Sequence, residues 1–260
     1  MILNFIKYQG TGNDFILIDN RQYIFPKGNI GLVSCLCDRK FGIGADGLIL
    51  LEPDTESDFK MVYYNSDGRQ STMCGNGGRC IVAFAKRLGL IGEEASFRAV
   101  DGLHRAKVMG DMISLEMQDV DEVTEKRNSM FLNTGSPHHV QLVKDLEHFD
   151  VRREGRKLRY GLYGQQGSNI NFVDDTGKDS FYVRTYERGV EDETLSCGTG
   201  VTAVAIAMRH AGRTQKNKVE ITTPGGPLEV SFKINEKGYH GIWLTGPAKM
   251  VFKGDIHVDA

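Results

Sequence analysis

The chain contains two similar segments, Met73-Cys74-Gly75-Asn76-Gly77 and Ser196-Cys197-Gly198-Thr199-Gly200. Each reads cysteine, glycine, a polar residue and glycine, and each leads into an apolar run of helical length. Glycines at the start of a helix leave backbone N–H groups free, and the helix dipole places positive potential beside the thiol. A cysteine in such a position ionises more readily than a free one, and the thiolate is the reactive form. The duplication therefore predicts two reactive thiols that face each other across a shared anion site.

The expected order of elements also recurs, so the chain reads as two similar halves. In each half a strand–turn–strand unit comes first, another strand leads to the cysteine and its helix, and paired strands follow. The predicted helices are Arg79–Leu88 and Val201–His210, and the second is apolar on almost every side, so it has to be enclosed. We predict an α+β fold of two pseudo-repeated lobes, each a curved, mainly antiparallel sheet or barrel wrapped around a central helix.

The boundary between the lobes is predicted in the charged stretch Asp119–Arg127, which has the composition of a linker. This gives an N-terminal lobe over residues 1–118 and a C-terminal lobe over residues 119–247. A last strand within residues 248–260 has no partner left in the second half and is expected to return to the first.

The composition indicates a soluble globular protein. Hydrophobic residues make up 40% and charged residues 25% of the 260 residues, and the formal net charge of -2 favours neither nucleic acid nor an anionic membrane as a partner. The first residues lack the features of a signal peptide, and no apolar run approaches the roughly 18–20 residues of a membrane span. We therefore expect a cytoplasmic protein.

The five cysteines do not have the spacing of a disulfide framework or a zinc site. We interpret Cys35 and Cys37 as buried or incidental, and Cys80 as a core residue of the first helix. Signatures of pyridoxal phosphate, flavin and nicotinamide sites are also lacking. The simplest interpretation is a reaction that needs neither a cofactor nor a metal.

Two activated thiols on opposite sides of one carbon can invert its configuration. One thiolate removes the hydrogen from one face and the other thiol delivers a hydrogen to the opposite face, and the roles exchange with the handedness of the substrate. Such thiols titrate as a coupled pair. Because the α-hydrogen of an amino acid is very weakly acidic, two helix N-termini at the substrate carboxylate would stabilise the developing charge.

The sequence resembles the diaminopimelate epimerase family. The resemblance covers nearly the whole chain, and the segments that carry it come in the expected order: Gly10–Phe15, Gly42–Gly47, Asn65–Gly68 with Met73–Cys80, Ser168–Val173, and Tyr186–Gly189 followed by Glu193–Gly200. It implies interconversion of L,L- and meso-2,6-diaminoheptanedioate without cofactor or metal. It also implies an active site in the cleft between two similar lobes, and a homodimer.

The resemblance also implies a role for individual residues. Cys74 and Cys197 match the two acid/base cysteines, while Glu187 and His138 match the pair that contacts the α-amino group and tunes the cysteines. Arg188 suits a carboxylate on physical grounds as well, because its guanidinium can bind in a bidentate manner. The full set implied to bind substrate is Asn13, Gly47, Asn65, Gly75, Asn76, Asn169, Glu187, Arg188, Gly198 and Thr199.

Two departures from the family pattern concern the far end of the substrate. Ser136 stands before the Pro-His pair where the family usually has asparagine, and the loop 189–194 is one residue longer than the commonest spacing.

The sequence leaves two alternative functions open. A proline or hydroxyproline racemase would share both cysteine turns, but those enzymes typically have histidine at the position of Asn76 and need no distal carboxylate clamp. A thiol switch or metal-binding protein that uses Cys74 and Cys197 without catalysis is the alternative from another class.

Overall fold

The computed structural model describes residues 1–177 and 179–258. Contacts within the chain divide it into two compact units, Met1–Leu115 together with the segment that begins at Pro247, and Glu116–Gly246. The predicted lobes, 1–118 and 119–247, have nearby limits, and their status as separate domains stays a prediction.

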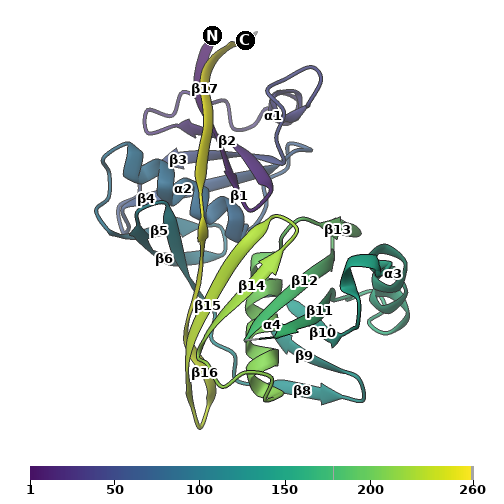
Figure 1. Ribbon diagram of the computed structural model, residues 1–260. Helices are drawn as coiled ribbons and strands as arrows, with labels where there is room; N and C mark the ends of the chain where they lie inside the picture. The colour runs from purple at the N-terminus through teal and green to yellow at the C-terminus, as the bar shows by residue number, and fades with distance from the viewer. Residues whose placement is uncertain (178, 259–260) are drawn as a thin grey trace. The chain divides into compact units, whose positions relative to one another are not determined.

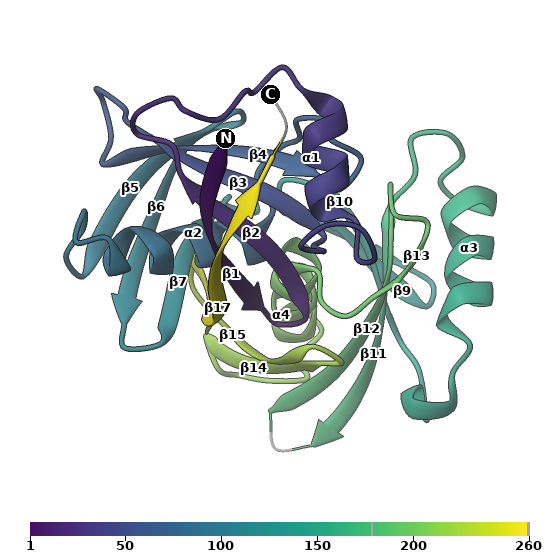
Figure 2. The same ribbon diagram turned by 90° about the horizontal axis from the view of Figure 1, so that it is seen from above.

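The first unit is a sheet with one helix on each face. Its helices are α1 (Ile30–Cys37) and α2 (Gly75–Arg87), and its strands are β1 (Ile2–Gly10), β2 (Asn13–Asp19), β3 (Gly47–Glu52), β4 (Phe59–Asn65), β5 (Glu94–Ala99), β6 (Gly102–Met109), β7 (Met112–Met117) and β17 (Lys249–His257). All six residues of β3 are buried, as expected for a strand covered on both faces. Strand β17 runs antiparallel to β1 along nearly its whole length (Figures 1 and 2).

Alternation along the strands directs side chains to the two helices. On one face, Ile16 and Leu48 belong to an apolar cluster with Val33 and Leu36 of α1. On the other face, α2 contacts β1, β2, β3 and β6.

The second unit is built in the same way. Its helices are α3 (Val151–Gly161), α4 (Gly198–His210) and the short η1 (Leu146–His148), and its strands are β8 (Val123–Lys126), β9 (Ser129–Asn133), β10 (Pro137–Leu142), β11 (Asn169–Gly177), β12 (Ser180–Glu187), β13 (Asp192–Thr194), β14 (Lys218–Thr223), β15 (Gly226–Asn235) and β16 (Gly238–Pro247). Residues Val201 to Met208 of α4 are all fully buried, and Figure 1 shows strands around this helix. Helix α3 packs on the opposite face through Val151 and Leu158.

The strand pairings confirm that the two halves repeat. In the first unit β2–β3 is parallel, β3–β4 antiparallel, β4–β5 parallel and β5–β6 antiparallel. In the second unit β10–β11, β11–β12, β12–β14 and β14–β15 follow the same order. The predicted fold of two lobes around enclosed helices is confirmed.

The prediction of a linker over Asp119–Arg127 is wrong. Strand β8 lies within this stretch and pairs with β9, and the backbone of buried Val120 pairs with Tyr239. An edge strand exposes most of its side chains, so its charged sequence resembles that of a loop. Both enclosed helices also begin a few residues earlier than predicted, at the glycine that follows each cysteine.

Candidate active site

Cys74 is the N-cap residue of α2. Its backbone is extended, with φ -94° and ψ 129°, and its carbonyl oxygen accepts a hydrogen bond of 2.7 Å from the N–H of Gly78. Gly75 and Asn76 are therefore the first residues of the helix, where backbone N–H groups lack partners within the helix. This is the arrangement that the glycines around Cys74 predict.

The side chain of Asn76 is fixed from both sides. Its Nδ2 donates to Oδ1 of Asn13 at 2.6 Å, and its Oδ1 accepts from Nη2 of Arg79 at 2.8 Å. Asn13 in turn donates to Oδ2 of Asp46 at 2.8 Å. Burial raises the pKa of the neighbouring Asp14, but hydrogen bonds from Arg39 and Lys7 outweigh it and hold that pKa at about 2. A network of charged side chains therefore anchors the two asparagines.

Gly47 and Asn65 face each other in the β3–β4 pair. A Cβ at Gly47 would lie 2.5 Å from the Tyr63 ring and from the Tyr64 carbonyl oxygen, so the strand requires glycine there. Asn65 is exposed at the end of β4, and the next residue, Ser66, donates its N–H to the carbonyl of Asp46. The predicted site residues of the first unit thus form one neighbourhood.

Arg79 belongs to the same neighbourhood, although sequence reasoning did not select it. It is fully buried, and its Nη2 also donates to Oγ1 of Thr11 at 2.9 Å. A buried guanidinium is costly without polar partners, and Nη2 finds them in Thr11 and Asn76, so Arg79 helps to hold Asn76 in place. An arginine within the otherwise apolar helix 77–85 is the sequence signal for it.

Cys197 occupies the equivalent N-cap position of α4 in the second unit. Its carbonyl accepts from the N–H of Val201 at 2.9 Å, and its Sγ lies 3.5 Å from Oγ1 of Thr199. The carbonyl of Thr199 accepts from Oγ1 of Thr134 at 2.9 Å, which ties the first turn of the helix to the β9–β10 turn. Gly198 and Thr199 therefore begin α4 as Gly75 and Asn76 begin α2.

Asn169, Ser136 and Arg188 lie together at the start of β11, where Asn169 is the first residue of the strand. Nδ2 of Asn169 donates to Oγ of Ser136 at 2.9 Å, and its Oδ1 accepts from the backbone N–H of Arg188 at 2.9 Å. The Arg188 guanidinium lies 3.5 Å from Oγ of Ser136 and donates to the carbonyl of Gln166. Ser136 thus occupies the centre of this cluster.

Burial favours the uncharged forms of both His138 and Glu187. His138 is fully buried beside Asn169 in the β10–β11 pair, and burial, aided by the Arg188 charge, lowers its pKa to about 3. Burial raises the pKa of Glu187, partly offset by a 2.9 Å hydrogen bond from Oγ1 of Thr194.

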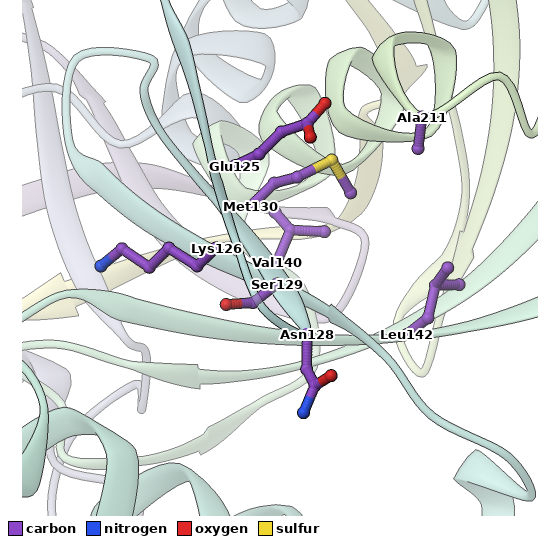
Figure 3. A pocket seen from close by; sticks show the side chains of 8 residues that line it. All are labelled: Glu125, Lys126, Asn128, Ser129, Met130, Val140, Leu142 and Ala211. Atoms are coloured by element: carbon purple, nitrogen blue, oxygen red, sulfur yellow. The ribbon is translucent and has the colours of Figure 1, made fainter.

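Two surface pockets inside the units lack the predicted site residues. The one in Figure 3 lies in the second unit and is lined by Glu125, Lys126, Asn128, Ser129, Met130, Val140, Leu142 and Ala211. Across residues 1–177 and 179–258, no three His, Cys, Asp or Glu side chains are grouped as metal ligands. In the same described residues, no helix is long and apolar enough to cross a membrane.

Comparison with known sequences shows which family has this chain's sequence pattern. The sequence model of the family described as diaminopimelate epimerase matches residues 5–121 and 130–251. The chain belongs to the diaminopimelate epimerase family. A relative of that name from Flavobacterium psychrophilum is 62% identical over 96% of this chain and 98% of its own length. Another from Aquifex aeolicus is 39% identical over 98% of both chains.

Solved structures outside the diaminopimelate epimerase family share the fold. A phenazine biosynthesis protein of the PhzF family from Bacillus anthracis has a TM-score of 0.80 at 12% identity, over 99% of this chain and 100% of its own. A hydroxyproline epimerase from Agrobacterium vitis, with bound trans-4-hydroxy-L-proline, has a TM-score of 0.70 at 15% identity, over 100% and 93%. At such identities the likeness shows the fold alone.

Proposed function

We propose that this protein interconverts L,L- and meso-2,6-diaminoheptanedioate with Cys74 and Cys197 as its two bases. The observation that carries the proposal is the repeated cysteine N-cap, found once in each unit of a chain of the diaminopimelate epimerase family. The product is a precursor of lysine and, in bacteria, of cell-wall peptide. A cytoplasmic location and a homodimer stay predictions.

In the proposed reaction one cysteine begins as a thiolate and the other as a thiol. The thiolate removes the α-hydrogen as a proton, and the thiol on the opposite face gives its proton to the α-carbon, so the charge state of the pair is exchanged after each turnover. The N–H groups that begin α2 and α4, at Gly75-Asn76 and Gly198-Thr199, bind the α-carboxylate and stabilise the developing charge from fixed dipoles.

The cluster around Ser136 suits the distal carboxylate of the substrate. Its Oγ accepts from Asn169 and lies near the Arg188 guanidinium, so the hydroxyl proton is left to donate elsewhere. Together with the guanidinium, this hydroxyl provides two donors for one carboxylate. Ser136 thereby serves in place of the asparagine that is usual in the family.

Deuterium incorporation tests the reaction. The protein is incubated with L,L-diaminoheptanedioate in deuterated water, and α-deuterium is followed separately in the substrate and in the meso product. With two bases, the product should carry deuterium at early times while the recovered substrate carries almost none. Equal labelling of both isomers would exclude two bases, and absence of turnover would exclude the epimerase activity.

The same assay separates the proposed substrate from its alternative. L-Proline and trans-4-hydroxy-L-proline offer no distal carboxylate to Arg188 and Ser136, so neither should acquire deuterium at a comparable rate. Comparable labelling of either would assign the protein to proline-type racemases.

A further inference from the structure

Asn171 is a fully buried amide that joins three parts of the second unit. It lies in β11 directly opposite Thr185 of β12. Its Nδ2 donates to the carbonyl of His139 at 2.9 Å and lies 3.2 Å from Nδ1 of His138. Its Oδ1 accepts from Oγ1 of Thr185 at 3.0 Å. No role follows for this residue from the sequence.

The hydrogen bonds of Asn171 fix the tautomer of His138. A backbone carbonyl only accepts hydrogen bonds, so the amide atom that faces His139 is Nδ2, a donor. The same Nδ2 faces Nδ1 of His138, which therefore accepts. A neutral imidazole that accepts at Nδ1 carries its proton at Nε2.

The resulting Nε2–H group of His138 is a donor without an acceptor among the described residues. Nε2 of His138 is buried and has no hydrogen-bond partner among the described residues. Buried donors are normally paired, so an unpaired one at a candidate site indicates an acceptor that arrives with the ligand or the reaction.

Asn171 also borders the first turn of α4. A Cβ added to Gly200 would lie 2.5 Å from Oδ1 of Asn171 and 3.4 Å from Sγ of Cys197. The contact with Asn171 requires glycine at this point, whereas the distance to Sγ is an ordinary van der Waals contact. The group that orients His138 is therefore packed beside the candidate base.

We propose that Asn171 is a positioning residue that holds His138 as the Nε2–H tautomer, so that His138 donates a hydrogen bond to an anion in the active site. The anion is the substrate carboxylate or the Cys197 thiolate. In this tautomer His138 neither removes a proton nor accepts a hydrogen bond from the α-ammonium group, so of the two roles that the family resemblance implies only an effect on the cysteine remains. The catalytic consequence rests on the proposed function, whereas the tautomer does not.

Nuclear magnetic resonance of protein labelled with ¹⁵N-histidine tests the tautomer directly. His138 is identified by the signals that disappear in His138→Gln. The expected spectrum shows the protonated nitrogen at Nε2 in the unmodified protein and a mixture of tautomers in Asn171→Ala. A proton at Nδ1 in the unmodified protein would overturn the proposal, and this measurement requires no Asn171 variant to fold.

Kinetics with a matched control test the consequence. Asn20 is another fully buried asparagine, bonded to Glu52 and to the N–H of Phe25 in the first unit. Asn171→Ala should lower kcat at least about tenfold, because loss of a well-placed hydrogen-bond donor to a developing anion costs about 10²–10³-fold in kcat. Asn20→Ala should remove comparable hydrogen bonds and yet leave both kcat and the His138 tautomer unchanged. Equal kcat in both variants would contradict the proposed role.

Alkylation distinguishes the two anions. In a Cys74→Ala background, the pH dependence of Cys197 alkylation is compared with and without Asn171→Ala. A higher pKa of alkylation identifies the thiolate as the acceptor, and an unchanged pKa with a raised KM in the Cys74-containing enzyme identifies the substrate carboxylate. If neither quantity changes, His138 donates to no anion and the proposal fails. Absence of epimerisation would refute the proposed function while the spectrum still decides the tautomer.

Discussion

Cys74 and Cys80 show how position separates a candidate base from a core residue on one helix. Cys74 begins α2, whereas Cys80 lies inside it and is fully buried. Burial raises the pKa of the Cys80 thiol to about 12, so it stays protonated at neutral pH.

The first prediction compares these cysteines by substitution. Cys74→Ala and Cys197→Ala should each lower the rate of epimerisation by at least about 10²-fold, because each removes the base for one face. Cys80→Ala is the matched control and should keep most of the activity with a modest loss of stability. The assay follows the loss of the circular dichroism of L,L-diaminoheptanedioate, because the meso isomer is achiral, and thermal unfolding verifies the fold. More than a few per cent residual activity in either active-site variant would refute the two-base mechanism.

The second prediction concerns His138 and pH. The unfolded histidine has a pKa near 6.5 and the folded one near 3, so below pH 6.5 the unfolded state binds the additional proton. Stability from the neutral imidazole is therefore complete above pH 6.5 and is lost as the pH falls toward 3, with a slope of up to about 1.4 kcal/mol per pH unit. His138→Gln should flatten this dependence in urea titrations at several pH values.

His148 provides the control for the pH dependence. It is exposed, and a hydrogen bond from its ring to Asp145 raises its pKa, so its contribution has the opposite sign. His148→Gln should therefore not flatten the loss of stability in acid. An unchanged slope in His138→Gln would show that this histidine is not neutral in the folded protein.

The third prediction concerns Arg188. Loss of a charge-assisted pair with a substrate carboxylate costs about 2–5 kcal/mol, so Arg188→Met should lower kcat/KM for diaminoheptanedioate by at least about 30-fold. Some of this loss should occur in kcat, because binding at the far end positions the α-carbon. Arg153→Met replaces an exposed arginine of α3 and should have no effect. Equal kinetics in both variants would remove Arg188 from the site.

At the residue scale, the sequence predicts the candidate site incompletely, and for physical reasons. The glycines beside each cysteine identify Cys74 and Cys197, because their pattern is local. Asn171 acts through partners on other strands, and only its two-residue spacing from Asn169 hints that both lie on one face of β11. The tautomer of His138 depends on a carbonyl orientation that no sequence pattern encodes.

At the scale of elements, a long apolar run indicated a helix, whereas a charged helix and a short helix were missed. Helix α4 is apolar throughout, so its enclosure follows from composition. Helix α3, Val151–Gly161, is dominated by charged residues and was not predicted, and the short α1 was missed as well. Both lie on the outer faces of their sheets, where few apolar residues suffice for packing.

The fourth prediction tests how closely α3 packs on β12. A Cβ at Gly155 would lie 2.4 Å from Cβ of Tyr186, the residue before Glu187 and Arg188. Gly155→Ala should therefore destabilise the protein by about 1–3 kcal/mol and raise KM through displacement of that strand end. Gly161→Ala in the same helix meets no atom within 4 Å and should be neutral or slightly stabilising. Urea unfolding and steady-state kinetics provide both comparisons, and equal stability of the two variants would contradict the argument.

At the scale of the whole molecule, the repeat matches what the proposed mechanism requires. Each unit supplies one N-cap cysteine and one set of helix N–H groups, and inversion of a carbon requires a base on each face. The chain also returns to its start, because β17 pairs with β1 after the second unit is complete. The pairing of the last strand with the first unit was predicted from the surplus strand, whereas the placement of β8 was not.

The last prediction tests whether the two cysteines meet. Two bases that act on one carbon must approach closely around it, and a disulfide forms when the two Cα atoms lie about 4.4–6.8 Å apart. Mild oxidation should therefore join Cys74 to Cys197 and abolish activity, and dithiothreitol should restore it. The experiment uses a Cys35→Ser background, because Cys35 is exposed and would form bonds between molecules. Peptide mapping should find the buried Cys37 and Cys80 still reduced. Inactivation with Cys74 and Cys197 both free would mean that the two thiols do not share one substrate carbon, and the proposed mechanism would then be wrong.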